Sequence, residues 1–326
     1  MNLKLDLATL TAGCEAEKLH LSGAIQNLGA LLILDLNGLR VSHISSNFET
    51  FTGLAAESVL DSSPEETLPW LAEVLASWLK TEKTNVHRLV PRIFSNAASW
   101  LDCWLIRSGE QIIVELFPSR QATPLPVHRL QLALFDTPRN NDQLAAYNEA
   151  LIAGIQEATG LARVMLYRFH EDFSGEVIAE RAAPGLGSYL GLRFPASDIP
   201  AIARRLYLIN PWRGIPDIHA AISPIIGEGT PDLTHSLLRS VSPVHLKYLE
   251  NMGVEASFSL PIKIGVQLWG LVTCHHPSPR VLDPQSCQLC ASLAKSYAMG
   301  LGIFLAQQRM QLIDSCLLYT SPSPRD

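Results

Sequence analysis

Short apolar runs separated by turn residues characterise the first third of the chain. The run from Ala30 to Leu36, the pair Asn37-Gly38 and the run from Leu39 to Ser45 predict two strands joined by a tight turn. Trp100 to Ile106 and Gln111 to Phe117 predict two further strands. With helical pieces expected between Asn47 and Leu79, this part of the chain should form a small α+β domain.

A second pattern begins after a proline-rich stretch. Residues 118 to 138 contain four prolines and show no clear hydrophobic period, which indicates a domain boundary. We therefore expect an N-terminal arm (1–25), a first domain (26–120), a linker (121–139), a second domain with a C-terminal helix (140–313) and a tail (314–326).

The second domain is also predicted to be α+β. Apolar residues at three- and four-residue spacing from Leu144 to Ile155, followed by Gly160, predict a helix with a glycine stop. Strands are expected at Val164 to Phe169, Glu176 to Arg181, Ala256 to Ile264 and Gln267 to His275, the last two forming a hairpin.

The last regular element is a long amphipathic helix from Pro284 to about Ile313, in which apolar residues recur every fourth position. Its exposed stripe is available for a dimer contact. The final residues, Thr320 to Asp326, have no core pattern and look like a cloning or sequence-assembly scar rather than folded protein.

Composition and charge argue against two classes of protein, those that bind nucleic acid and those that span a membrane. The chain has 326 residues, 47% of them hydrophobic, and a formal net charge of −6, which argues against nucleic acid as a partner. No uninterrupted apolar run reaches the roughly 18 residues of a membrane span, and Asp6 interrupts any N-terminal signal sequence. We expect a cytoplasmic protein without a membrane partner, in which cysteines are free thiols unless they carry chemistry.

Specific motifs go further than composition. The segment from Phe194 to Pro200 reads FPASDIP and is followed by Arg204-Arg205-Leu206-Tyr207. It resembles the signature of the chromophore-binding GAF domain of phytochromes. Further segments match in the family's order: Tyr167 to Phe169, Ser174 to Glu176, Leu238 to Leu249, Asn251 to Gly253, Leu268 to Leu271 and Cys274 to His276.

The N-terminal arm carries a resemblance of its own. Residues 14 to 26 are similar to the arm that precedes the PAS domain of bacteriophytochromes, so the resemblance covers about residues 10 to 310. It implies an α+β protein in which a PAS domain precedes a GAF domain, with the arm threaded through a GAF loop in a figure-of-eight knot. Ile25 matches the threaded position and the loop would be roughly Ile215 to Leu238. The chain departs from the family at Asn27-Leu28, where a Pro-His pair is usual.

The position of one cysteine separates the subfamilies. Plant and cyanobacterial phytochromes attach a linear tetrapyrrole to a cysteine just before the histidine that matches His245, and this chain has Val244 there. Bacteriophytochromes use an arm cysteine, and Cys14 stands at that place. The resemblance therefore implies biliverdin IXα held by a thioether at Cys14. An accessible, partly ionised thiol on an arm suits that addition.

The resemblance also assigns the remaining pocket residues. A guanidinium grips a carboxylate with two charge-assisted bonds, and the imidazole of His245, with a pKa near neutrality, could exchange protons with the central pyrroles. The matched positions are Arg213, Arg239, Ser242, Ser257 and Ser259 for the propionates, His245 and Asp198 for the pyrroles, Tyr167, Tyr207, Tyr248 and His275 for the D ring, and Phe194, Ile199 and Pro200 in the signature.

These features imply a red/far-red photoreceptor that isomerises the D ring, forms a homodimer and, with a following PHY domain and histidine kinase, signals to a response regulator. The chain ends at the connecting helix, and nothing in it looks catalytic. The alternative is a chromophore-free PAS-GAF module for interaction or dimerisation. Cys287 and Cys290 have metal-like spacing, but a second pair is missing and both fall in the long helix, so we expect no metal site.

Overall fold

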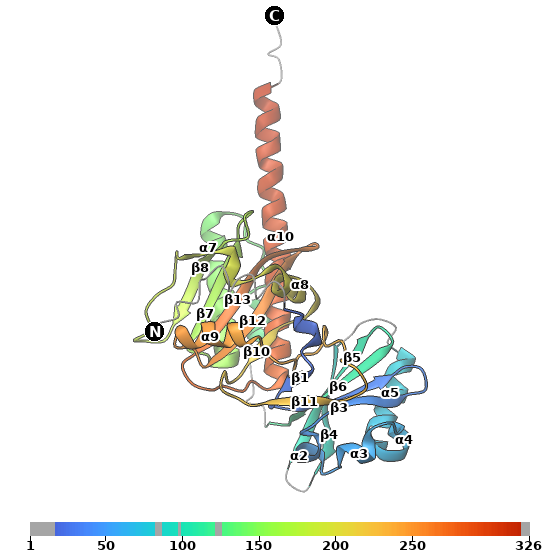
Figure 1. Cartoon of the computed structure of the whole chain (residues 1–326). Coiled ribbons are helices and arrows are strands. Elements are labelled where there is room, and N and C mark those ends of the chain that lie inside the picture. The colour runs from blue at the N-terminus through green and yellow to red at the C-terminus, as the bar shows by residue number, and fades with distance from the viewer. Residues whose placement is uncertain (1–16, 82–86, 97–98, 121–125, 321–326) are drawn as a thin grey trace, which may run out of the picture. The chain divides into compact units, whose positions relative to one another are not determined.

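The computed structural model describes residues 17–81, 87–96, 99–120 and 126–320 (Figure 1). Within it the chain forms two compact units. The first combines the chain up to residue 123 with residues 199–258 and 276–285, and the second comprises residues 124–198, 259–275 and the chain from 286 onward. Each unit mixes helices and strands, as the predicted α+β class requires.

A seven-stranded antiparallel sheet forms the centre of the first unit. Its strand order is β1-β11-β3-β2-β6-β5-β4. Both predicted hairpins are present, β2 with β3 and β5 with β6. The strands are β1 (Ala24–Gln26), β2 (Ala30–Asp35), β3 (Arg40–Ser45), β4 (His87–Ser95), β5 (Trp100–Ser108), β6 (Gln111–Pro118) and β11 (Ile222–Gly227).

Four short helices lie against this sheet and close its hydrophobic core. Fully buried residues such as Leu32, Val114 and Phe48 come together there from strands and helices. Pro64 starts one helix, and Ser63 with Glu66 forms a capping box around that start. The helices are α2 (Phe48–Thr52), α3 (Ala56–Val59), α4 (Pro64–Thr67) and α5 (Pro69–Thr81). All four begin within the segment predicted to be helical, Asn47 to Leu79, and α5 extends two residues beyond it.

The rest of the first unit is built from shorter pieces: η1 (Leu19–Leu21), α8 (Ala201–Ile209), β10 (Arg213–Ile215) and α9 (Pro243–Asn251). Ile215, Ile218, Leu249 and Val254 form a small buried cluster under α9. This cluster fixes α9 and β10, which carry several of the predicted site residues.

The strands of the second unit follow the order β12-β13-β7-β8-β9, with β12 entering the unit at Ser259. Gly265, with φ of 59°, lies in the turn between β12 and β13, so the predicted hairpin is confirmed. The bounds are β7 (Arg163–Phe169), β8 (Gly175–Ala182), β9 (Arg193–Phe194), η2 (Ala196–Asp198), β12 (Ala256–Ile264) and β13 (Gln267–His276).

Three helices accompany these strands, namely α6 (Val127–Leu132), α7 (Asn141–Thr159) and α10 (Pro284–Thr320). Helix α7 ends at Gly160, which takes the left-handed conformation expected of a glycine stop. Tyr147 on α7 stacks on Tyr297 of α10 with ring centroids 5.0 Å apart. By composition α10 is long and apolar enough to cross a membrane, but half of its most apolar stretch is buried inside the protein, as in a core helix.

Candidate functional site

Two arginines predicted to bind propionates lie close together in the first unit. Arg213, on β10, donates from Nη2 to the carbonyl of Arg239 at 2.7 Å and to that of Ser240 at 3.0 Å. Arg239 donates from Nη1 to the carbonyl of Leu233 at 3.0 Å. Among the described residues, neither guanidinium forms an ion pair with a carboxylate. In the described part of the chain, the hydrogen bonds of both guanidiniums go to backbone carbonyls.

The proximity of these two cations favours the binding of an anionic ligand. Burial lowers the pKa of Arg213 to about 10, and burial together with the charge of Arg213 lowers the pKa of Arg239 to about 9. Both side chains remain protonated at neutral pH, so two like charges share a poorly solvated region. The buried carboxyl of Glu115 and Tyr207, on α8, each raise both pKa values and so offset part of this lowering. A ligand with carboxylates would relieve the repulsion.

Helix α9 carries the next group of predicted residues. Its Ser242 stands at the N-cap but makes no capping bond, and the hydroxyl is buried without a hydrogen-bond partner in the described part of the chain. Such an orphaned polar atom is the kind of group that a polar ligand satisfies. The rings of His245 and Tyr248 stack with centroids 6.1 Å apart.

His245 differs from the expectation in its ionisation. Burial, followed by the positive charge of Arg213, lowers the pKa of His245 to about 4, below the near-neutral value predicted from the sequence. The imidazole is therefore neutral at pH 7 in this structure, with one nitrogen as donor and the other as acceptor.

The signature FPASDIP ends where α8 begins. Pro200 is the N-cap residue of α8, and Arg204 donates from Nη1 to the carbonyl of Ile199 at 2.5 Å. The helix then places the half-buried Tyr207 in its last turn. Ser257, buried on β12, belongs to the same unit.

In the second unit, Tyr167 and Phe194 form an aromatic cluster. Their ring centroids are 6.1 Å apart, and Phe169 meets the ring of Tyr167 edge-on at 5.4 Å. Gly175 makes room for this cluster, because a Cβ there would lie 1.9 Å from a Tyr167 ring carbon. The structure thus brings together two of the predicted aromatic residues.

Three other predicted residues of the second unit lie on different elements. Asp198 ends η2 and is half-buried, with its N–H donated to the carbonyl of Pro195 at 3.1 Å. His275 is half-buried on β13, and Ser259 is buried on β12.

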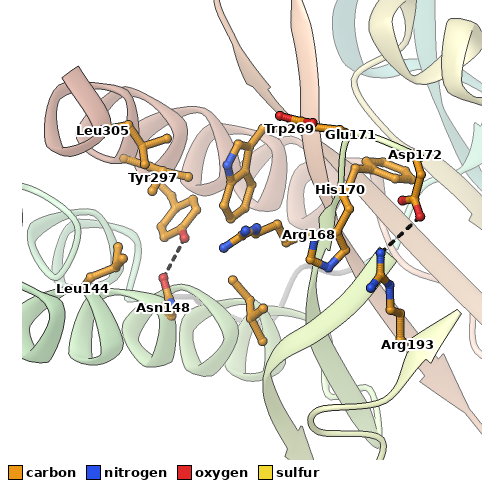
Figure 2. A pocket seen from close by; sticks show the side chains of 13 residues that line it. Leu144, Asn148, Arg168, His170, Glu171, Asp172, Arg193, Trp269, Tyr297 and Leu305 are labelled. Atoms are coloured by element: carbon orange, nitrogen blue, oxygen red, sulfur yellow. Dashed lines mark hydrogen bonds and ion pairs between the residues drawn. The ribbon is translucent and has the colours of Figure 1, made fainter. Parts of the chain in front are cut away.

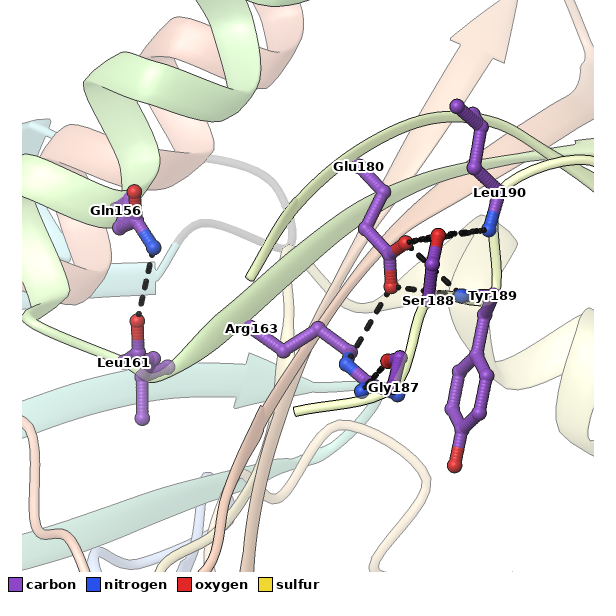
Figure 3. A network of polar contacts seen from close by, with 8 residues as sticks. All are labelled: Gln156, Leu161, Arg163, Glu180, Gly187, Ser188, Tyr189 and Leu190. Carbon is purple, nitrogen blue, oxygen red and sulfur yellow. Dashed lines mark hydrogen bonds and ion pairs between the residues drawn. The ribbon is translucent and has the colours of Figure 1, made fainter. Parts of the chain in front are cut away.

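A buried ion pair that sequence reasoning missed holds the loop before Phe194 (Figure 3). Glu180 accepts hydrogen bonds from the Ser188 hydroxyl and from the N–H groups of Tyr189 and Leu190. Its carboxylate also lies 3.4 Å from Nε of Arg163, whose guanidinium stands over the Tyr189 ring at 3.8 Å. Nothing in the sequence indicated that charged residues on the predicted strands would be buried. We call the Glu180–Arg163 ion pair, with its bonds to the loop, the clamp of Glu180 and Arg163.

A pocket of about 670 Å³ lies elsewhere in the second unit, between α7, α10 and the β7–β8 turn (Figure 2). None of the predicted site residues lines it. Its polar side chains satisfy one another in part: Arg193 pairs with Asp172 at 3.1 Å, and the Tyr297 hydroxyl donates to Asn148 at 2.6 Å.

The described part of the arm contains η1 and then β1, where Ile25 is completely buried. On one side β1 pairs with β11, and on the other Gln26 donates its N–H to the carbonyl of Leu238 at 2.8 Å. At the departure from the family pattern, the Asn27 side chain accepts from Asn47 at 2.6 Å and from Ser223 at 3.0 Å. Cys14 lies outside the described residues, and the knot stays a prediction.

Comparison with known proteins bears on this site. Residues 14–119 match the PAS fold family and residues 146–301 match the GAF domain family. The chromophore-binding domain of an unusual bacteriophytochrome from R. palustris has a TM-score of 0.78 and 31% identity, over 90% of this chain and 99% of that one. The Stigmatella aurantiaca phytochrome photosensory core module has a TM-score of 0.80 and 32% identity, over 90% of this chain and 60% of that one.

Curated relatives agree with the solved structures. The bacteriophytochrome of Pseudomonas aeruginosa is 37% identical over 284 residues, which are 83% of this chain and 38% of that protein. The bacteriophytochrome of Xanthomonas campestris pv. campestris is 35% identical, over 94% of this chain and 49% of its own length. The chain therefore spans less than half of these relatives. The predicted order of a PAS domain and then a GAF domain is confirmed.

Proposed function

Since the chain belongs to the phytochrome family, whose members are red/far-red photoreceptors, we propose that it binds biliverdin covalently and detects light by isomerisation of the D ring. The observation that carries this proposal is the pair of buried guanidiniums of Arg213 and Arg239, neither of which forms an ion pair with a carboxylate in the described residues.

The residues present fit a bilin with two propionates. Arg213 and Arg239 bind and orient the carboxylates, and each can form charge-assisted hydrogen bonds in addition to those to backbone carbonyls. The orphaned hydroxyl of Ser242 gains a partner, and Ser257 and Ser259 supply further hydroxyls. Neutral His245 can accept or donate a hydrogen bond at a pyrrole nitrogen.

Attachment uses the thiol of Cys14. The sulfur forms a bond to a vinyl carbon of the A ring, and the thiol proton ends on the neighbouring vinyl carbon, so the addition needs no oxidant or reductant. Val244 stands where a cysteine would be needed for the plant-type attachment, which leaves Cys14 as the proposed site.

When bound, the bilin supplies light absorption and double-bond isomerisation. Around the D ring, the resemblance assigns an aromatic wall and one hydrogen-bond donor, His275. The packing of Phe169, Phe194 and Gly175 around Tyr167 restrains that ring, as a wall requires. The resemblance assigns the main chain of Asp198 to the pyrrole N–H groups, and Ile199 and Pro200 follow it in the signature. Tyr207 and Tyr248 complete the proposed wall.

The partners of the whole protein are part of the same proposal. We place the light-sensing region in a cytoplasmic homodimer, followed in the full-length protein by a PHY domain and a histidine kinase that phosphorylates a response regulator. The described residues of this chain give no support for enzymatic activity of its own.

A direct test is to co-express the chain with a heme oxygenase and record absorption before and after red light. Zinc-enhanced fluorescence of the denatured protein on a gel then reports covalent bilin. We expect a red-absorbing, light-responsive protein and a fluorescent band that is lost in Cys14→Ala. The matched control is Cys316→Ala, which removes an exposed cysteine and should keep the band.

The alternative, a chromophore-free PAS-GAF module, predicts a folded but colourless protein. A light-responsive spectrum without a covalent band would keep the photoreceptor and reject attachment at Cys14. A colourless folded protein would reject the photoreceptor proposal.

A further inference from the structure

Glu115 is a completely buried carboxylic acid in the middle of the seven-stranded sheet, on β6. Its Oε1 accepts a hydrogen bond from the Ser236 hydroxyl at 2.5 Å and another from the N–H of Leu238 at 2.9 Å. Oε2 is buried and has no hydrogen-bond partner in the described residues. Burying an acid is costly, and the two hydrogen bonds to the turn offset part of that cost.

The turn from Ser236 to Arg239 continues directly into the proposed bilin site. The Ser236 hydroxyl oxygen accepts the N–H of Arg239 at 2.9 Å, while the carbonyl of Arg239 accepts Nη2 of Arg213 at 2.7 Å. Glu115 is thus connected through Ser236 to the backbone of Arg239. The carbonyl of Arg239 in turn connects it to the guanidinium of Arg213.

The same turn also holds the arm. Gln26 donates its N–H to the carbonyl of Leu238 at 2.8 Å, and Ser240 donates its N–H to the carbonyl of Ala24 at 3.0 Å. Ile25 and Arg239 form a β-bridge between these two bonds. Since Cys14 precedes this strand by about ten residues, the turn sets the point from which the arm reaches toward its attachment site.

We propose that Glu115 is a positioning residue for bilin binding: through the Ser236–Arg239 turn it fixes both the propionate-binding Arg239 and the strand that follows Cys14. This inference rests on the proposed function, because it takes the bilin to bind at Arg239 and Cys14. It adds a residue of the seven-stranded sheet whose hydrogen bonds go to the Ser236–Arg239 turn.

The charges around Glu115 make its interaction with the Ser236–Arg239 turn sensitive to pH. Burial raises the pKa of Glu115 to about 7, against the lowering effect of the bonds from Leu238 and Ser236 and of the charge of Arg213. Arg239 also interacts with this carboxyl, and Cys103, on β5, is a buried thiol beside it. The carboxyl therefore changes charge near neutral pH, and its ionised form binds the turn more strongly.

The test measures the rate at which purified apoprotein attaches biliverdin, with the red absorption spectrum as a second readout. Glu115→Ala should attach at least about tenfold more slowly and broaden the red band, because the turn loses both bonds. Glu115→Gln should recover to within about threefold, since one amide oxygen can accept both bonds. Asp102→Ala is the matched control: this buried acid bonds the N–H of Arg92 and should leave the rate unchanged.

A pH series separates positioning from mere structural support. The ratio of the wild-type rate to the Glu115→Gln rate should rise about threefold between about pH 6 and pH 8, and taking the ratio removes the ionisation of Cys14 itself. His235 lies beside Ser236, and its pKa is lowered by burial, so His235→Gln should be measured as well and should keep the trend.

A wild-type rate and spectrum in folded Glu115→Ala would overturn the inference, as would a flat ratio in the pH series. If Glu115→Ala fails to fold, Ser236→Ala decides: slower attachment supports the inference and a wild-type rate rejects it. Failure of the wild-type protein to take up biliverdin would instead reject the proposed function, and this inference with it.

Discussion

Gly175 and Tyr167 stand so close that the ring of the tyrosine occupies the place of a side chain on the glycine, with a ring carbon 1.9 Å from where Cβ would be. The two residues lie on the paired strands β7 and β8, so neither backbone can withdraw without breaking the ladder. Any side chain at position 175 must displace the Tyr167 ring from its contacts with Phe169 and Phe194.

Gly175→Ala is therefore expected to destabilise the protein by about 1–3 kcal/mol and to shift or broaden the red absorption band of the bilin-loaded protein. Thermal unfolding and absorption spectra measure both effects. Gly187→Ala is the control, because a Cβ there meets nothing within 4 Å. Equal stability and spectra for the two variants would contradict the proposed role of Tyr167.

The second prediction concerns the clamp of Glu180 and Arg163. Glu180→Ala leaves a buried guanidinium without its counterion and the Tyr189 and Leu190 N–H groups without an acceptor, so a loss of about 3–5 kcal/mol is expected. Urea unfolding measures it. Glu157→Ala, which breaks an exposed ion pair with Arg129, should cost no more than about 1 kcal/mol. A similar small loss in both variants would mean that the clamp does not hold the loop.

The third prediction is a pH dependence of stability. The pKa of Glu115 is about 7 in the folded protein and that of an unperturbed glutamic acid is 4.5. Between these values the unfolded chain releases the proton while the folded protein keeps it, so stability is full below about pH 4.5 and falls by about 3 kcal/mol as pH rises to about 7.

Chemical denaturation across this pH range checks the prediction. In Glu115→Gln this component of the pH dependence should disappear, and the difference between the two proteins should be largest at the alkaline end. Parallel curves for the two proteins would show that Glu115 does not titrate in this range.

The fourth prediction tests what the arginines bind. In a Cys14→Ala background, Arg213→Gln should weaken biliverdin binding by about 10- to 100-fold, the value of lost charge-assisted bonds. Biliverdin dimethyl ester, which lacks the carboxylates, should bind equally to both proteins. The control Arg205→Gln changes an exposed arginine on α8 and should bind biliverdin normally. If Arg213→Gln also weakened binding of the dimethyl ester, the loss of affinity would not be due to the propionates.

The sequence predicted the elements that rest on local patterns. The turn at Asn37-Gly38, the helix that ends at Gly160 and the hairpin around Gly265 all follow from neighbouring residues, and the structure confirms each of them. Strand β4 was missed because Pro91 and the left-handed Arg92 interrupt its alternation, at a register shift between Val90 and Phe94.

Contacts between distant segments were beyond the reach of such patterns. Residues 215–238 were expected to form a loop without a period, yet they contain β11, whose pairing partners are nearly 200 residues away in the sequence. The roles of Glu115 and Glu180 were missed for the same reason, because burial of a charged side chain depends on partners from other elements. The predicted bilin residues came from family resemblance, and physical patterns alone would not have selected them.

The position of β11 in the sheet has a consequence for synthesis on the ribosome. Strand β3 is hydrogen-bonded to β2 on one side and to β11 on the other, so the sheet of the N-terminal domain is incomplete until residue 227 has left the exit tunnel. Until then the nascent chain exposes an unpaired strand edge, a known starting point for aggregation. A fragment cut in the proline-rich stretch of residues 118–138 would keep that open edge permanently, and a fragment that retains the whole sheet must extend at least to residue 227.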